Sequence, residues 1–273
     1  MVDAVDAVDA VDAAARAVII TRPRSQALAL QRKVAALGRE AIVFPLLEIH
    51  PLADNAALDA ALAWLEQNAL VAFVSPNAID AAFARRQPWP PTVPLAVMGE
   101  GSRQALAAHG ITSSSTTIFS PADTGRTDSE TLLAALDLPA LAGRPVLVLR
   151  GESGRELLAD ALRTAGALVT QVAAYRRSAP VLDAEHCQQL QALLDKDCDW
   201  IITSSEALQV LLAMVRTLPG ATNEVLVVRL QHQRLIVPHA RIAETAHALG
   251  FCNVLRTASG DEGLLAALQF GHE

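Results

Sequence analysis

The sequence predicts an α/β protein with two doubly wound parallel sheets, and three observations support this fold class. The chain has 273 residues and is 52 % apolar, enough to fill one large core or two smaller ones. Short apolar runs alternate with amphipathic segments of about three helical turns, a pattern typical of parallel sheets covered on both faces. The two halves of the chain also resemble each other, so the architecture is predicted to occur twice.

In each half the repeat begins with a strand, a turn and a helix. Residues 17–38 read AVIITRPRSQALALQRKVAALG, and residues 145–166 read PVLVLRGESGRELLADALRTAG. Each segment continues into a second predicted strand, at residues 41–49 and 167–175. At a constant offset, five residues of the first segment match five of the second, namely Val18, Arg22, Ser25, Leu30 and Gly38 with Val146, Arg150, Ser153, Leu158 and Gly166.

The repeat continues through two further strands and their helices. Residues 70–83 parallel residues 199–212, each a strand that runs into a serine-containing turn and a helix. Residues 94–110 parallel residues 234–250 in the same way. ETLLAAL near the end of the first half nearly repeats as EGLLAAL in the second, and each is predicted to form the last helix of its half. A short fifth strand could precede this helix. Glycines stand where a left-handed residue would end a helix, at Gly38, Gly110, Gly166 and Gly250. We therefore expect two flavodoxin-like domains.

Composition argues against several functions. The net charge of −7 and the 4 % of aromatic residues do not suit a nucleic-acid-binding surface. Cys187, Cys198 and Cys252 form no CxxC pair, which favours free thiols in a reducing cytosol. No apolar run reaches the ~18–20 residues of a membrane span. Residues 1–16 contain four Val-Asp-Ala triplets and are interpreted as a low-complexity extension, not a signal peptide, so we expect a cytoplasmic protein.

Familiar catalytic motifs are absent from the sequence. The segment from Gly99 has only the first two glycines of GxGxxG, because Gln104 takes the third place. No P-loop lysine follows GESGRE, and neither HExxH nor GxSxG occurs. We therefore expect no cofactor, no metal site and no covalent serine intermediate.

The turns that follow the strands are the candidate binding site, because ligands of doubly wound sheets bind beyond the C-terminal strand ends. Hydroxyl and amide side chains there either cap their own helices or help the helix N-termini to hold an anion. Arg22 and Arg150 occupy equivalent turns, and a guanidinium group suits a carboxylate, although a lone surface arginine is more often only solvated. Together the turns predict an anion site in a cleft between two domains, formed by Thr21, Arg22, Ser75, Asn77, Gly99, Ser102, Arg150, Gly151, Ser204, Ser205 and Arg241.

The ordered set of segments resembles the uroporphyrinogen-III synthase family over about residues 17–268. One turn departs from the family pattern. Many members have a Gly-Pro-Thr-Thr-like sequence where this chain has His239-Ala240-Arg241-Ile242, so a threonine proposed to bind substrate is absent and Arg241 could replace it. The segments that carry the resemblance are VIITRP, FPLLEI, VAFVSPNAI, VMGEGSRQAL, SETLLAAL, VLVLRGESGRELLADALRTAG, VAAYRRS, WIITSSEAL and IVPHARIAETAHALG.

The resemblance implies two flavodoxin-like domains joined by a two-stranded linker. A tandem duplication alone would suggest one domain for each half of the chain. Family members instead interlock, which here implies one domain of residues 17–44 plus 181–273 and another of residues 45–180. The linker strands would lie within the second range, near residues 46–51 and 173–179.

The resemblance also implies a cyclising lyase without a cofactor. Its substrate would be hydroxymethylbilane, a linear tetrapyrrole, which loses water and closes to uroporphyrinogen III with ring D inverted. Tyr175, the only tyrosine of the chain, matches the tyrosine of the family's VY(R/Q) motif and would assist departure of the hydroxyl by hydrogen bonding. A buried tyrosine with no catalytic role is the alternative. A monomer that receives its substrate by transient hand-over from the preceding pathway enzyme is the implied assembly.

Two other functions stay open on the sequence. One is a two-domain clamshell that binds a small anionic ligand without chemistry. The other is a nucleotide-sugar transferase, which also pairs two doubly wound domains but is usually a longer chain.

Overall fold

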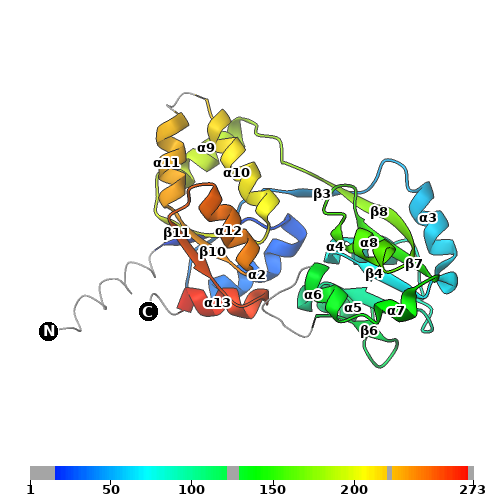
Figure 1. Cartoon of the computed structure of the whole chain (residues 1–273). Helices are drawn as coiled ribbons and strands as arrows, with labels where there is room; N and C mark the ends of the chain where they lie inside the picture. Colours follow the sequence, from blue (N-terminus) through cyan, green and yellow to red (C-terminus); the bar gives the residue numbers. More distant parts are fainter. Residues whose placement is uncertain (1–15, 122–128, 220–222, 270–273) are drawn as a thin grey trace. The chain divides into compact units, whose positions relative to one another are not determined.

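The computed structural model describes residues 16–121, 129–219 and 223–269, and these form two compact units. One unit comprises the described residues up to Glu48 together with those from Ala179 onwards, and the other comprises Ile49–Ser178. The chain passes from one unit to the other twice, as the colours of Figure 1 show. The predicted extension, apart from Arg16, lies outside the described residues. The predicted domains, residues 17–44 plus 181–273 and residues 45–180, stay a prediction.

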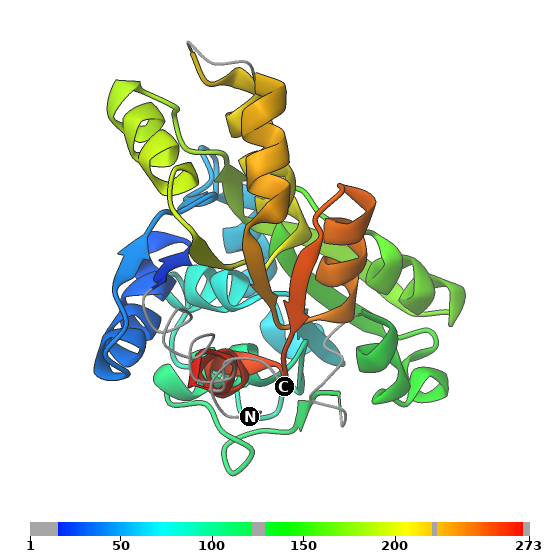
Figure 2. The same cartoon turned by 90° about the vertical axis from the view of Figure 1, so that its left-hand side faces the viewer.

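The first unit contains a five-stranded sheet in the order β11-β10-β9-β1-β2, and every neighbouring pair in it is parallel. Strands β10 and β11 run side by side in Figures 1 and 2. The strands are β1 (Ala17–Ile20), β2 (Ala41–Val43), β9 (Cys198–Ile201), β10 (Arg234–Val237) and β11 (Asn253–Arg256).

Helices cover both faces of this sheet. Because successive strand residues point to opposite faces, Ile19 packs into one core and Val18 into the other. The sheet is thus buried on both sides, which explains why β1 and β2 are continuous apolar runs. The first core is closed by α9 (Ala184–Leu194), α10 (Ser205–Thr217), α11 (Asn223–His232) and α12 (Ala240–Ala248), and the second by α2 (Arg24–Ala36) and α13 (Gly260–Gln269).

The second unit contains a six-stranded sheet in the order β3-β8-β7-β4-β5-β6, in which the strands from β8 to β6 pair in parallel. Its strands are β3 (Glu48–His50), β4 (Leu70–Phe73), β5 (Leu95–Val97), β6 (Ile118–Phe119), β7 (Pro145–Gly151) and β8 (Leu168–Ser178). One face is covered by α3 (Ala56–Ala63), a 3₁₀ turn at Leu65–Gln67, α4 (Pro76–Phe83) and α5 (Glu100–Ala108), and the other by α6 (Ser129–Ala134), α7 (Leu138–Leu141) and α8 (Leu157–Thr164).

The internal repeat reappears in the two sheets, with segments exchanged between the halves of the chain. Strands β1 and β2 of the first half lie beside β9, β10 and β11 of the second half, while β7 and β8 lie beside β4, β5 and β6. The register is also repeated, because Val18 lies opposite Asp199 and the matching Val146 lies opposite Leu70. The two sheets therefore follow one doubly wound plan, which confirms the predicted fold class.

Several local features agree with the sequence, and others do not. The glycines predicted to end helices all have positive φ, from 77° at Gly38 to 89° at Gly166. The sequence repeat did not predict α3, α7, α9 or α11, which lie between the matching segments. Helix α8 begins only at Leu157, later than expected, because residues 152–156 form a longer turn.

A buried ion cluster lies at the N-terminal ends of the strands in the first unit. The Nη2 atom of Arg39 is 2.8 Å from Oδ2 of Asp199, and Nη1 of Arg234 is 3.6 Å from its Oδ1. All three side chains are buried, with Asp199 fully enclosed. Arg39 also donates to the carbonyl oxygen of Leu268, so the cluster holds the end of α13 against the sheet. In the part of the chain that the structure describes, no helix is long and apolar enough to cross a membrane.

Candidate functional site

The predicted site residues fall into two groups, each beyond the C-terminal strand ends of its own sheet. The structure places Ser75, Gly151 and Tyr175 in contact, whereas the cleft predicted between two domains stays a prediction. The second unit holds Ser75, Asn77, Gly99, Ser102, Arg150, Gly151 and Tyr175, and the first holds Thr21, Arg22, Ser204, Ser205 and Arg241.

A hydrogen bond joins the hydroxyl groups of Tyr175 and Ser75. The two oxygen atoms are 3.0 Å apart, although the residues are 100 positions apart in the sequence. Tyr175 lies near the end of β8 and is 4 % exposed. Ser75 follows β4 and caps α4, where its Oγ accepts the backbone N–H of Ala78 at 3.2 Å. The sequence predicted both positions but gave no signal for their contact.

A bulge in β8 directs the Tyr175 side chain into this position. The pairing of β7 with β8 runs to Arg150 opposite Ala173, and Gly151 then lies opposite Tyr175. Ala174 is therefore an extra residue, and such a bulge re-aims the side chain that follows it. The ring packs on Gly151, where a Cβ atom would lie 3.1 Å from Cζ and 3.2 Å from Oη of the tyrosine. Gly151 thus leaves the space that the ring needs.

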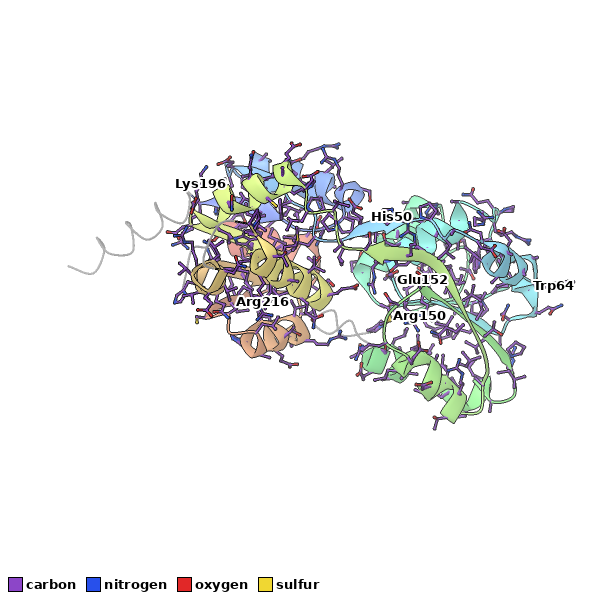
Figure 3. All side chains as sticks on the ribbon, turned by 90° about the horizontal axis from the view of Figure 1, so that it is seen from above. His50, Trp64, Arg150, Glu152, Lys196 and Arg216 are labelled. Carbon is purple, nitrogen blue, oxygen red and sulfur yellow. The ribbon has the colours of Figure 1, made fainter. Side chains whose placement is uncertain are left out.

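The guanidinium group of Arg150 is buried and pairs with Glu156, a partner that the sequence did not reveal. The hydrogen bond from Arg150 and a weaker contribution from Gln171 hold the pKa of the Glu156 carboxyl below its ordinary value. A Cβ atom at Gly154 would lie 2.9 Å from Nη2 of the arginine. Arg150 is labelled within the packed side chains in Figure 3, whereas Trp64 is 62 % exposed and projects from the edge. Arg150 therefore stabilises the turn of residues 151–156.

The equivalent arginine of the first unit, Arg22, also has a carboxylate partner. Its Nη1 is 2.6 Å from Oδ1 of Asp261, and Nζ of Lys33 is 2.9 Å from Oδ2. Burial raises the pKa of the Asp261 carboxyl, but the hydrogen bonds from Lys33 and Arg22 outweigh it, so the pKa lies below its ordinary value. The bridge ties the end of β1 to the start of α13. A substrate carboxylate at Arg22 would have to share the guanidinium with Asp261.

Two of the predicted hydroxyl groups are buried. Thr21 donates to the carbonyl oxygen of Ile201 at 2.7 Å and is 1 % exposed, and Ser102 is 4 % exposed. The hydroxyl of Thr21 is therefore already paired inside the unit, and both residues present little surface to a ligand. Ser205 bonds to the hydroxyl of Thr245 at 3.0 Å, which links α10 to α12, and Arg241 is exposed at the start of α12.

Two of the predicted turn residues cap their own helices with their side chains. Ser204 caps α10 as Ser75 caps α4. Helices α5 and α12 begin at Gly99 and His239 without a side-chain cap, so their first-turn N–H groups have no such partner. Uncapped N-termini of this kind attract anions. Among residues 16–121, 129–219 and 223–269, no group of three His, Cys, Asp or Glu side chains could hold a metal ion.

Comparison with known proteins extends these observations. The family model described as uroporphyrinogen-III synthase HemD matches residues 29–266. The uroporphyrinogen-III synthase of Escherichia coli (strain K12) is 34 % identical over 260 residues, which are 92 % of this chain and 99 % of that protein. The uroporphyrinogen-III synthase of Salmonella typhimurium (strain LT2) is 34 % identical over 263 residues, with the same coverage.

Solved structures share the fold at low sequence identity. The uroporphyrinogen-III synthetase of Helicobacter pylori 26695 superposes with a TM-score of 0.57 at 17 % identity, covering 93 % of this chain and 98 % of that one. A mutant uroporphyrinogen III synthase of the extremely thermophilic bacterium Thermus thermophilus has a TM-score of 0.56 at 15 % identity, covering 93 % and 99 %. Since the family model and the two sequence relatives each span most of the chain, this protein belongs to the uroporphyrinogen-III synthase family.

Proposed function

We propose that this chain cyclises hydroxymethylbilane to uroporphyrinogen III, with loss of water and inversion of ring D, and that Tyr175 assists the first step. Family membership supports the reaction. The observation that carries the assignment of the site is the phenol of Tyr175, held at the C-terminal strand edge by Ser75. Ligands of doubly wound sheets bind at this edge.

The proposed chemistry needs little beyond position and charge. Tyr175 donates a hydrogen bond to the hydroxymethyl oxygen and passes its proton to it, so the hydroxyl departs as water and leaves an azafulvene cation. The substituted carbon of ring D attacks this cation to give a spiro intermediate, which fragments and recloses with ring D inverted and then loses a proton. The proton released after ring closure returns to the phenolate. Because pyrrole electrons drive each bond change, the protein must mainly hold the chain and stabilise a transient cation.

The proposed substrate contacts are the turns of both units, and their chemistry suits the carboxylate side chains of the tetrapyrrole. Backbone N–H groups at the uncapped starts of α5 and α12 are anion donors. Arg241 is exposed and free to extend toward a carboxylate in place of the absent turn threonine. Gly99 precedes α5, Asn77 lies in the first turn of α4, and Ser204 and Ser205 lie at the start of α10.

We further propose that the protein acts as a cytoplasmic monomer. Transient hand-over of the unstable substrate from the preceding pathway enzyme is part of this proposal. A reducing compartment is consistent with the three free cysteines, of which Cys252 is exposed.

Turnover distinguishes this enzyme from a clamshell that only binds an anion. Hydroxymethylbilane is supplied in large excess over the protein, and its disappearance is followed against the spontaneous rate. The enzyme consumes many substrate molecules per chain, faster than the background. A binder instead protects one equivalent of substrate, and that result would overturn the proposal.

A further inference from the structure

We infer that Ser75 is a positioning residue for this reaction, acting through the hydroxyl group of Tyr175 and not by direct contact with the substrate. The inference rests on the proposed function. Its structural basis is one hydroxyl that holds two partners, the phenol of Tyr175 at 3.0 Å and the backbone N–H of Ala78 at 3.2 Å.

The hydrogen-bonding capacity of Ser75 determines what it can do for Tyr175. A serine hydroxyl has one proton to donate and two lone pairs to accept with. One lone pair of Ser75 accepts from Ala78, so the proton is available for the phenolic oxygen. When Ser75 donates to that oxygen, the proton of Tyr175 is left free for the departing hydroxyl of the substrate. The serine donor also stabilises the partial negative charge that develops on the phenolic oxygen during the step.

The position of Ser75 at a helix start strengthens this effect. The first N–H groups of α4 carry the positive end of the helix dipole, and the N–H of Ala78 points at the serine oxygen. A hydroxyl that accepts from such a group becomes a better donor, because hydrogen bonds in a chain polarise one another. Ala78, Ser75 and Tyr175 form such a chain, and the substrate hydroxyl would be its fourth member.

The internal repeat supplies a comparison within the molecule. Ser204 occupies the equivalent turn and caps α10 in the same way. By the offset that relates the first strands and helices, the counterparts of Gly151 and Tyr175 are Pro23 and Leu47. The capping serine is thus present in both units, but only the second unit adds the phenol and the glycine that makes room for it. Helix capping alone explains Ser204 and does not explain the arrangement around Ser75.

A double-mutant cycle tests the inference, because coupled residues give non-additive effects. Ser75→Ala should lower kcat about tenfold, the loss that one hydrogen bond to the reacting group would cause, with KM within about twofold. In a Tyr175→Phe background the same change should cost less than about twofold, because the hydroxyl on which Ser75 acts is gone. Equal fold-losses in both backgrounds would show that Ser75 acts independently of the phenol and would overturn the inference.

Further variants separate this role from helix capping. Ser75→Gly, which costs a helix start only a few tenths of a kcal/mol, gives the same cycle if the alanine variant fails to fold. Ser75→Thr keeps the hydroxyl and should retain kcat within about threefold. The matched control is Asp137→Ala, which removes the side-chain cap of α7. Oδ1 of Asp137 accepts the backbone N–H of Ala140 at 3.2 Å, the same distance as in the cap at Ser75. Asp137→Ala should leave kcat unchanged, and a tenfold loss in this control would count against the inference.

A spectroscopic readout is available because Tyr175 is the only tyrosine. The tyrosine doublet of the Raman spectrum reports whether a phenol donates or accepts a hydrogen bond. Ser75→Ala should change the doublet, and an unchanged doublet would contradict the contact. The two proposals fail differently. If the unsubstituted protein yields no uroporphyrinogen III, the proposed function fails, whereas an active protein with an additive cycle refutes only the role of Ser75.

Discussion

Gly151 is the residue on which the geometry around Tyr175 depends most closely. The Tyr175 ring lies directly against Gly151. A Cβ atom at position 151 would be 3.1–3.3 Å from three atoms of the tyrosine side chain, which is closer than ordinary van der Waals contact. The neighbour that would have to move is the ring itself, and its hydroxyl would then leave Ser75. Glycine is therefore required here by the close approach of a side chain and not by an unusual φ.

We predict that Gly151→Ala lowers kcat about tenfold while destabilising the fold by about 1 kcal/mol, the cost of slight overpacking. Steady-state kinetics and chemical denaturation measure the two effects. Gly110→Ala is the control, because a Cβ there meets nothing within 4 Å, although its φ of 78° strains the backbone. It should reduce stability and spare kcat. A folded Gly151→Ala protein with full kcat would show that the ring position does not matter.

The sequence indicated the positions of the site residues better than their contacts. Ser75, Gly151 and Tyr175 were all placed at strand ends by the repeat and the family resemblance. Their meeting depends on the bulge after Arg150, which shifts the register of β8 by one residue and leaves no mark in the apolar pattern. The sequence also did not predict that Arg150 pairs with Glu156 and Arg22 with Asp261. Packing decides which side chains pair, and the periodicity of the sequence does not show it.

At the scale of elements, α13 is held to the first sheet at both of its ends. Asp261 in its first turn bridges Arg22 and Lys33. At its other end, the carbonyl oxygen of Leu268 accepts from the buried Arg39. The carboxylate of Asp261 at the start of α13 and the guanidinium of Arg39 at its end also complement the helix dipole.

This bridge predicts a pH dependence of stability. The pKa of Asp261 in the folded chain lies below the ordinary value of 3.8, so its contribution is fully present above that value and is lost as the pH falls through the lowered pKa. At pH 7, Asp261→Asn should destabilise the first unit by about 1 kcal/mol, and the difference from the unsubstituted protein should shrink as the pH falls below about 4. Urea unfolding at a series of pH values measures it. A difference that is constant over this range would contradict the role of the carboxylate.

The buried cluster of Arg39, Asp199 and Arg234 is a feature of the first sheet that the internal repeat did not predict. By the repeat, the counterparts of Asp199 and Arg39 in the second unit are Leu70 and Ala167. Nothing in the repeat predicts buried charges in one sheet and apolar side chains at the same places in the other. They are tolerated because both arginines pair with Asp199 and also donate to backbone carbonyl groups.

At the scale of the whole molecule, duplication explains the fold and leaves its connectivity open. Two sheets with the same order of matching strands follow from the repeat, and the matching strands have the same register. Whether β1 and β2 join their own half or the other half cannot be read from periodicity, because both choices bury the same faces. The structure has the exchanged arrangement, with the chain passing between units within β3, after Glu48, and at the end of β8.

Inversion of ring D during ring closure is visible in the isomer of the product. Hydroxymethylbilane closes spontaneously to uroporphyrinogen I, without inversion, so the protein must compete with that reaction. The product is oxidised and its isomers are separated by chromatography at a series of protein concentrations. If this chain inverts ring D, the type III fraction rises with protein concentration until it dominates. Type I as the sole product at every concentration would show that the chain does not invert ring D.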